Sequence, residues 1–171
     1  MIRLEDHVRE VPDFPKKGIQ FKDIMPMLLS PEAFRTAIEA LGSKVPRPDA
    51  VVGIESRGFL FGAPLALHWK VPFVPARKFG KLPGRTVRQV YSLEYGEDTL
   101  ELHADALQKG QRAVVVDDLL ATGGTAAATG RLVGQLGARI EALLFLIELS
   151  GLGGRNKLAP HRVEALLTLG A

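Results

Sequence analysis

Short runs of apolar residues, each the length of one β-strand, recur along the sequence between longer segments that fit helices. The clearest runs are AVVGI at 50–54, RAVVV at 112–116 and EALLFLIEL at 141–149, and a last one is expected at 163–169. Continuous apolar runs of this length are typical of strands buried on both faces of a parallel sheet. The alternation therefore predicts an α/β fold, a single domain with a mostly parallel open sheet flanked by helices.

Three helices are expected between these strands. Ser-Pro-Glu at 30–32 supplies a capping hydroxyl, a proline that fits the first helical position and an acid in the first turn, and Gly42 is expected to end this helix. Residues 59–69 are apolar enough for a second helix, although a glycine and a proline inside it argue against a regular one. A third is predicted over 125–136, ended by Gly137.

The middle of the chain changes character. Residues 71–77 (VPFVPAR) favour a strand weakened by two prolines, and 78–88 (KFGKLPGRTVR) are rich in Lys, Arg, Gly and Pro, which predicts an exposed basic loop. YSLEY and TLEL then flank Gly-Glu-Asp at 96–98 with alternating apolar residues. This pattern indicates a hairpin.

Composition limits the chemistry. The chain has 171 residues, a formal net charge of +3 and no cysteine, which excludes disulfides, thiolate metal sites and a cysteine nucleophile. The first residues lack a signal peptide's apolar stretch and no run is long enough to span a membrane, so a cytoplasmic protein without membrane contact is expected. The histidines share no metal-ligand spacing; they are His7, His68, His103 and His161.

The stretch VVVDDLLATGGTA, residues 114–126, carries the strongest functional signal. Asp117 and Asp118 follow the predicted strand, where parallel sheets bind ligands, and the Thr-Gly-Gly-Thr at 122–125 leads into a predicted helix whose first amides can hold an anion. Two acids beside a phosphate site fit a ligand that also brings hydroxyl donors or a divalent cation. A sugar phosphate suits both parts of the stretch, because its hydroxyls can bind the acids and its phosphate can bind the loop. The alternative is an acidic helix cap followed by a plain turn. The common P-loop and dinucleotide patterns are both missing.

This stretch resembles the 5-phosphoribosyl-1-pyrophosphate (PRPP) signature of the type I phosphoribosyltransferases. Further segments resemble the adenine phosphoribosyltransferases in particular: FPKKGIQFKDI, ESRGFLFG, RKFGKLPG, YSLEYG and LIELSGLGGRNKLAP, in the right order from about residue 13 to 160. The resemblance implies one phosphoribosyltransferase domain over 1–171, with an N-terminal base-binding hood over about 1–30 and a lid loop and hairpin over about 78–102.

The resemblance also implies a reaction. Adenine and PRPP would give AMP and pyrophosphate through an oxocarbenium-like transition state, with Mg²⁺ delivered by PRPP and no direct protein ligand to the metal. Asp117 and Asp118 would hold the ribose hydroxyls. The 5′-phosphate would lie in a cradle formed by Ala121, Thr122, Gly123, Gly124 and Thr125.

Other positions acquire roles in the same way. Pyrophosphate would be bound by Glu55, Ser56, Arg57, Arg77, Lys78 and Lys81, and in similar proteins the peptide between the first two is often cis. Adenine would be held mainly by backbone groups of Gln20, Phe21 and Lys22, with the phenylalanine stacking on the base; the glutamine is polar where relatives often have an apolar residue. Catalysis would involve Arg57 together with Glu94 and Tyr95 of a closing lid.

Several alternatives stay open. The acid pair and phosphate loop also fit enzymes for guanine, hypoxanthine or orotate, and ESRGFLFG and YSLEYG favour adenine. A PRPP-sensing regulator would keep the loop but add a nucleic-acid-binding surface, which the slight charge excess does not favour, so no nucleic acid is expected. An inactive dimerising scaffold is a third possibility. Similar proteins are homodimers, which makes Trp69 a candidate for the core or for a dimer contact.

Overall fold

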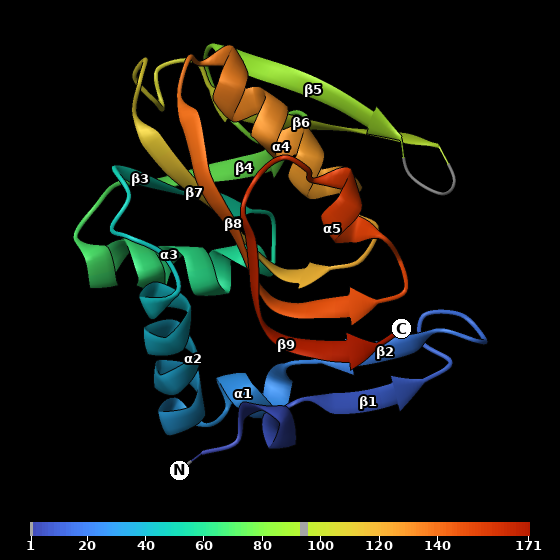
Figure 1. Cartoon of the computed structure of the whole chain (residues 1–171). Coiled ribbons are helices and arrows are strands. Elements are labelled where there is room, and N and C mark those ends of the chain that lie inside the picture. The colour runs from blue at the N-terminus through green and yellow to red at the C-terminus, as the bar shows by residue number, and fades with distance from the viewer. Residues whose placement is uncertain (1, 93–95) are drawn as a thin grey trace.

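The computed structural model describes residues 2–92 and 96–171, which form one α/β unit with a small N-terminal hairpin beside it (Figure 1). The main sheet has seven strands in the order β5-β6-β4-β3-β7-β8-β9, and a two-stranded sheet pairs β1 with β2. The strands are β1 Arg9–Pro12, β2 Gln20–Asp23, β3 Ala50–Ile54, β4 Phe73–Lys78, β5 Thr86–Ser92, β6 Glu97–His103, β7 Arg112–Leu120, β8 Arg139–Ser150 and β9 Val163–Gly170.

The pairing confirms a mostly parallel sheet. Strands β4, β3, β7, β8 and β9 run parallel to one another, with Val51 opposite Val114 and Val114 opposite Ala142, whereas β6 pairs antiparallel with both β4 and β5. Every residue of β3 is buried, as its continuous apolar sequence predicts. The antiparallel edge is the expected hairpin, although β5 already starts at Thr86. Residues 86–88, predicted as loop, are therefore strand.

Helices cover both faces of this sheet. The two long ones on one face are α2, Pro31–Ser43, and α3, Gly58–Trp69; α4, Gly124–Gln135, lies on the other face (Figure 1). Because strand side chains alternate between faces, Val114 and Val116 of β7 pack with α2 and α3, and Val115 packs with α4. The shorter helical segments are η1 Leu4–His7, α1 Met25–Leu28 and α5 Gly154–Lys157, which the sequence did not predict.

Two helix predictions are corrected by packing. The Ser30 hydroxyl caps α2 by accepting from the Ala33 amide at 3.3 Å, as expected, but α2 continues through Gly42 to Ser43. A Cβ at Gly42 would lie 3.0 Å from the His68 imidazole, so this glycine allows α2 and α3 to approach closely rather than ending the helix. Helix α3 runs unbroken past Pro64, because the burial of its apolar side chains, Trp69 included, outweighs the local cost.

Strand β7 is longer than predicted. It continues to Leu120, with Asp117 paired to Phe145 and Leu120 to Glu148 of β8. The acid pair therefore lies inside the strand, near its carboxyl end, rather than after it. This extends the backbone hydrogen bonding to both aspartates, so that their Cα positions are fixed by the sheet. Across the described residues, none of the helices is long and apolar enough to cross a membrane.

Candidate active site

The two aspartates of β7 lie at the centre of the carboxyl edge of the sheet. Asp118 is only 4% exposed, and its Oδ2 is 2.8 Å from Nε of Arg57, although the angles do not form an aligned hydrogen bond. The Asp117 Oδ1 accepts from the Asp118 amide at 2.9 Å. A Cβ at Gly58 would lie 2.7 Å from the Val116 carbonyl oxygen and 3.0 Å from Asp117 Oδ1, so only glycine allows α3 to start against this pair.

Burial and mutual repulsion make the acid pair electrostatically unfavourable. Burial raises the pKa of Asp117 well above its usual value, and the adjacent Asp118 charge raises it further. Burial also raises the pKa of Asp118, although the Arg57 guanidinium opposes this shift. A buried carboxylate beside a partly buried one, with Arg57 as their nearby cation, costs stability, and such groups cluster where a ligand supplies further partners.

A compact loop connects β7 to α4 and forms a cradle at the helix start. Gly123 has φ +78, a conformation that favours glycine, and the loop and first turn of α4 line a cavity of about 90 Å³ that Asp117 also borders. The first amides of a helix have no partner within it, so they face this space. The loop that the sequence predicts as a phosphate cradle therefore lines a hollow, to which Thr122 and Thr125 both contribute.

A residue that the sequence did not single out shapes this loop. A Cβ at Gly154, the first residue of α5, would lie 2.2 Å from the Ala121 carbonyl oxygen, and a Cβ at Gly123 would lie 2.8 Å from the Gly154 carbonyl oxygen. The backbones of α5 and the loop therefore touch directly. In the sequence, Gly154 belongs to the family-like segment LIELSGLGGRNKLAP, but the paired glycine in GLGG at 151–154 by itself predicts only a turn.

The N-terminal hairpin of β1 and β2 faces the same edge. The Arg57 guanidinium carbon is 5.1 Å from the centre of the Phe21 ring, and Phe14 packs edge-on against Phe21, also at 5.1 Å. Lys22 is buried and its ammonium pairs with Glu10 across the hairpin, so its side chain serves the hairpin. Gln20 is exposed at the rim.

Between the hairpin and the sheet lies a largely apolar cavity of about 370 Å³. It is lined by Gly18, Ile19, Gln20, Phe21, Lys22, Leu119, Ala121, Leu149, Leu152 and Ala171. This volume is typical of a small-molecule site. Figure 1 shows why the last residue takes part, since the C-terminus lies beside β2.

A charged cluster surrounds the end of β3. The Glu55 carboxylate accepts from Lys81 Nζ at 2.7 Å, from the Lys78 amide at 2.9 Å and from Arg77 Nε at 3.3 Å, and the Glu55–Ser56 peptide bond is cis. Burial alone would raise the pKa of Glu55, but the hydrogen bonds from Lys81, from the Lys78 amide and from Arg77 outweigh it and bring the pKa to about 2. The Lys78 ammonium lies apart from this cluster and pairs with Asp98 at 3.1 Å.

The basic loop after β4 is anchored by a buried acid that the sequence analysis missed. Glu101 is 1% exposed and accepts from the Gly80 amide at 2.9 Å, from Arg88 Nε at 2.8 Å and from the Thr86 hydroxyl at 3.1 Å. Its alternating sequence context, TLEL, does not distinguish it from an exposed strand glutamate. Glu94 and Tyr95 lie outside the described residues; next to them Ser92 pairs with Glu97 in the hairpin.

Glu55 gives the site a measurable pH dependence. Its pKa of about 2 lies below the ordinary 4.5, so its ion pairs stabilise the fold fully above pH 4.5 and lose that effect as the pH falls toward 2. With Lys81 half exposed, we expect Glu55→Gln to lower the free energy of unfolding at pH 7 by about 1–2 kcal/mol. Urea unfolding at pH 7 and pH 3.5 should show this difference shrinking at the lower pH.

A matched control for this prediction is Glu39→Gln. Glu39 is 62% exposed and pairs with Arg35 at 4.0 Å within α2. The control should change stability by less than about 0.5 kcal/mol at either pH. A difference for Glu55→Gln that grows on acidification would contradict the assigned charge cluster.

The fold and site define a class of protein, a mostly parallel α/β domain with an acid pair and a glycine turn into a helix at the carboxyl edge of its sheet. Comparisons with known proteins agree with that class. Residues 30–157 match the phosphoribosyl transferase domain family. An adenine phosphoribosyltransferase of Synechococcus sp. (strain CC9605) is 57% identical over 98% of this chain and 99% of its own length.

Solved structures give the same result. The crystal structure of an adenine phosphoribosyltransferase from Thermoanaerobacter pseudethanolicus superposes with a TM-score of 0.94 at 50% identity, covering 98% of this chain and all of that one. The enzyme from Saccharomyces cerevisiae, solved with an imino-altritol bisphosphate and adenine, gives 0.91 at 43% identity over 96% of each chain. The chain belongs to the phosphoribosyltransferase family, among the adenine phosphoribosyltransferases.

Proposed function

We propose that this protein transfers the 5-phosphoribosyl group of PRPP to adenine, giving AMP and pyrophosphate in purine salvage. The observation that carries the proposal is the acid pair at the end of β7, followed directly by the Gly123 turn and the start of α4. Carboxylates and free amides a few residues apart match the two ends of a ribose 5-phosphate. The names of the relatives supply the base, which this edge of the sheet alone does not specify.

Asp117 and Asp118 are assigned to the ribose 2′- and 3′-hydroxyls. A diol offers hydrogen-bond donors to both carboxylates, and Asp118 Oδ2 has no hydrogen-bond partner within residues 2–92 and 96–171. The amides and hydroxyls of residues 121–125 are assigned to the 5′-phosphate. As pyrophosphate leaves, positive charge grows at the ribose C1′, and two acids held by the sheet stabilise that charge.

Pyrophosphate is assigned to the cations around β3 and β4. Arg57 lies between the acid pair and the hairpin, while Arg77 and Lys81 are held by Glu55. Pyrophosphate would compete with the Glu55 carboxylate for Arg77 and Lys81. Ser56 and Lys78 are proposed to bind pyrophosphate as well. A planar guanidinium suits this role because it can donate paired hydrogen bonds to phosphate oxygens.

Adenine is assigned to the cavity of about 370 Å³ beneath the hairpin. Phe21 lines this cavity as a proposed stacking partner. The Lys22 side chain is engaged with Glu10, so the base is proposed to bind those backbone groups of residues 20–22 that do not pair with β1. Glu94 and Tyr95 are proposed to close over the reacting centre, with Glu94 moving a proton at the imidazole edge of adenine. Holding the reactants in place can itself lower the barrier by about 7–11 kcal/mol.

Mg²⁺ is proposed to arrive with PRPP, held by its phosphates and hydroxyls. Within the described ranges, His, Asp and Glu side chains form no cluster of three that could hold a metal, whereas the acid pair fits a cation that the substrate brings. When bound, Mg²⁺ would neutralise charge on the departing pyrophosphate.

The protein is further proposed to be a cytoplasmic homodimer. The side chains of Leu29 and Leu67 are 76% and 80% exposed and offer apolar surface for such a dimer.

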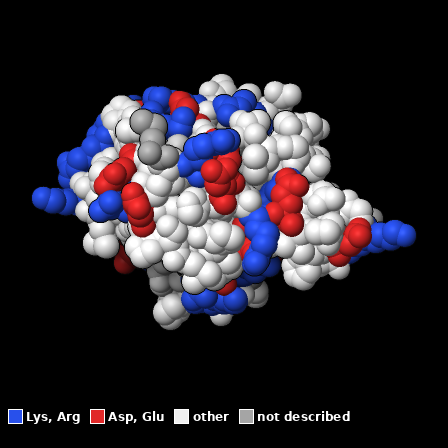
Figure 2. Space-filling view, turned by 90° about the horizontal axis from the view of Figure 1, so that it is seen from below, with Lys and Arg blue, Asp and Glu red and all other residues white. Residues whose placement is uncertain are grey.

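The test is to incubate the protein with PRPP and Mg²⁺, offer each nucleobase separately and identify the nucleotide formed. Adenine is expected to be the only base that yields a nucleotide, and that nucleotide is expected to be AMP. Formation of another mononucleotide in its place would contradict the base assignment. DNA binding in a gel shift without turnover would instead favour a PRPP-sensing regulator. On the face shown in Figure 2, Lys and Arg are interspersed with Asp and Glu, and this mixed charge does not suit a DNA-binding surface.

A further inference from the structure

Lys157 is the last residue of α5 and lies at the rim of the proposed phosphate cradle. It lines a cavity of about 460 Å³ together with Thr122, Gly124, Thr125 and residues of β5. Its Nζ is 3.7 Å from the position that a Cβ on Gly124 would take. Since Gly124 is the first residue of α4, this ammonium lies beside the helix end that presents free amides.

The two basic residues of α5 differ in their partners. Arg155 donates through Nε to Glu148 Oε1 at 3.1 Å, and its guanidinium also pairs with the other oxygen of that carboxylate, which attaches α5 to β8. Lys157, by contrast, makes no ion pair within residues 2–92 and 96–171. One residue thus anchors the short helix, and the other is available for an anion.

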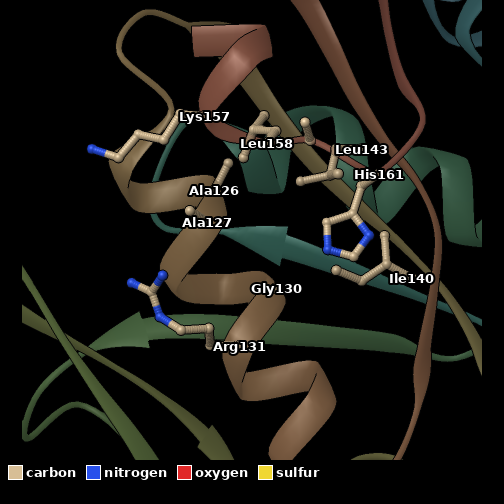
Figure 3. Close-up of a pocket in the computed structure, with 10 residues that line it drawn as sticks. Ala126, Ala127, Gly130, Arg131, Ile140, Leu143, Lys157, Leu158 and His161 are labelled. Atoms are coloured by element: carbon tan, nitrogen blue, oxygen red, sulfur yellow. The ribbon is translucent and has the colours of Figure 1, made fainter.

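The position of Lys157 is set by the same contacts that shape the loop. Gly154 touches the backbone of Ala121 and Gly123, so α5 cannot shift relative to the cradle without moving it. Figure 3 shows the Lys157 side chain extending away from Ala126 and from His161. Arg131 lies about one turn further along α4; it borders, together with Lys157, an outer cavity of about 210 Å³ but does not line the cavity beside Thr122 and Thr125.

We propose that Lys157 binds the 5′-phosphate of PRPP and of AMP, donating to a phosphate oxygen from the outer side of the cradle. The amides of the loop supply donors but no full charge, and a dianionic phosphate beside the aspartates of β7 needs a cation nearby. A charge-assisted hydrogen bond from Lys157 provides it. This inference rests on the proposed function and adds a phosphate-binding residue to it.

The test uses Lys157→Met, with Arg131→Met as its control. Both variants remove one positive charge from the same end of the molecule, but only Lys157 borders the cradle. Calorimetric titration with ribose 5-phosphate should give a dissociation constant about 10- to 100-fold higher for Lys157→Met. Arg131→Met should stay within about twofold of the parent, since a distant exposed charge is screened.

Three further measurements separate binding from structure. Affinity for pyrophosphate and the melting temperature should be unchanged in Lys157→Met, and Lys157→Arg should restore most of the ribose 5-phosphate affinity. Equal weakening by both Met variants, or parental affinity in Lys157→Met, would overturn the inference. A parent protein that binds ribose 5-phosphate but makes no AMP from adenine contradicts the proposed function only, because the binding comparison still decides the role of Lys157.

Discussion

Asp117→Asn is expected to lower kcat/KM for PRPP by about 100-fold, the loss of one or two charge-assisted hydrogen bonds to the ribose hydroxyls. The same substitution should raise the melting temperature. Burial and the neighbouring Asp118 charge raise the pKa of Asp117, so its ionised form costs stability, and asparagine keeps the acceptor for the Asp118 amide without the charge. Steady-state kinetics and thermal unfolding on the same sample would measure both effects.

The gain in melting temperature of Asp117→Asn should depend on pH in one direction. Because the folded-state pKa of Asp117 lies above 3.8, the parent loses stability relative to the variant as the pH rises from that value through the folded pKa. The gap in melting temperature should therefore be largest near neutral pH and shrink toward pH 4. Asp105→Asn, an exposed carboxyl away from the acid pair, is the control and should alter neither property. A variant that is both less stable and fully active would refute the assignment.

Gly154→Ala should disrupt the phosphate cradle from outside it. The new Cβ would lie 2.2 Å from the Ala121 carbonyl oxygen and 2.8 Å from a Leu120 methyl group, and backbone atoms cannot move aside as flexible side chains do. Overpacking of this kind costs about 1–3 kcal/mol. Since the loop must shift to relieve the contact, affinity for ribose 5-phosphate should fall by more than about tenfold, measured by calorimetry.

A second glycine provides the control. Gly134 lies in α4 with nothing within 4 Å of its added Cβ and with an ordinary helical backbone, so Gly134→Ala should stabilise the protein by about 0.5–1 kcal/mol and leave ligand affinity unchanged. Parental ribose 5-phosphate affinity in Gly154→Ala would show that the loop tolerates displacement. The proposed dependence of the cradle on α5 would then be wrong.

The acid pair and the cradle are held in place by different means. Hydrogen bonding of β7 to its neighbours fixes the backbone of both aspartates, and the core on both faces of the sheet offsets the cost of burying them. The cradle depends on backbone contact with a short helix about thirty residues later in the chain. The rest of the fold therefore supplies the stability that the charged site lowers, as is usual for enzymes whose active sites are destabilising.

Much of the fold was predictable because its signals are local. Strand β3 was placed at 50–54 as observed, and α4 was shifted by one residue, since apolar runs and capping residues depend only on near neighbours in the sequence. The errors arose where packing overrides local preference. Pro64 does not break α3, Gly42 does not end α2, and β7 continues through two aspartates that a strand pattern disfavours.

The sequence by itself determined the α/β class, the acid pair beside a glycine turn and the resemblance that gives the family. Only the tertiary structure decided that Arg57 faces both Asp118 and Phe21, that Glu55 gathers two cations, and that Gly154 and Lys157 border the cradle. The physical reason is distance along the chain. Periodicity and capping act within a few residues, whereas the site joins segments that meet only because the order of strands in the sheet brings them to one edge.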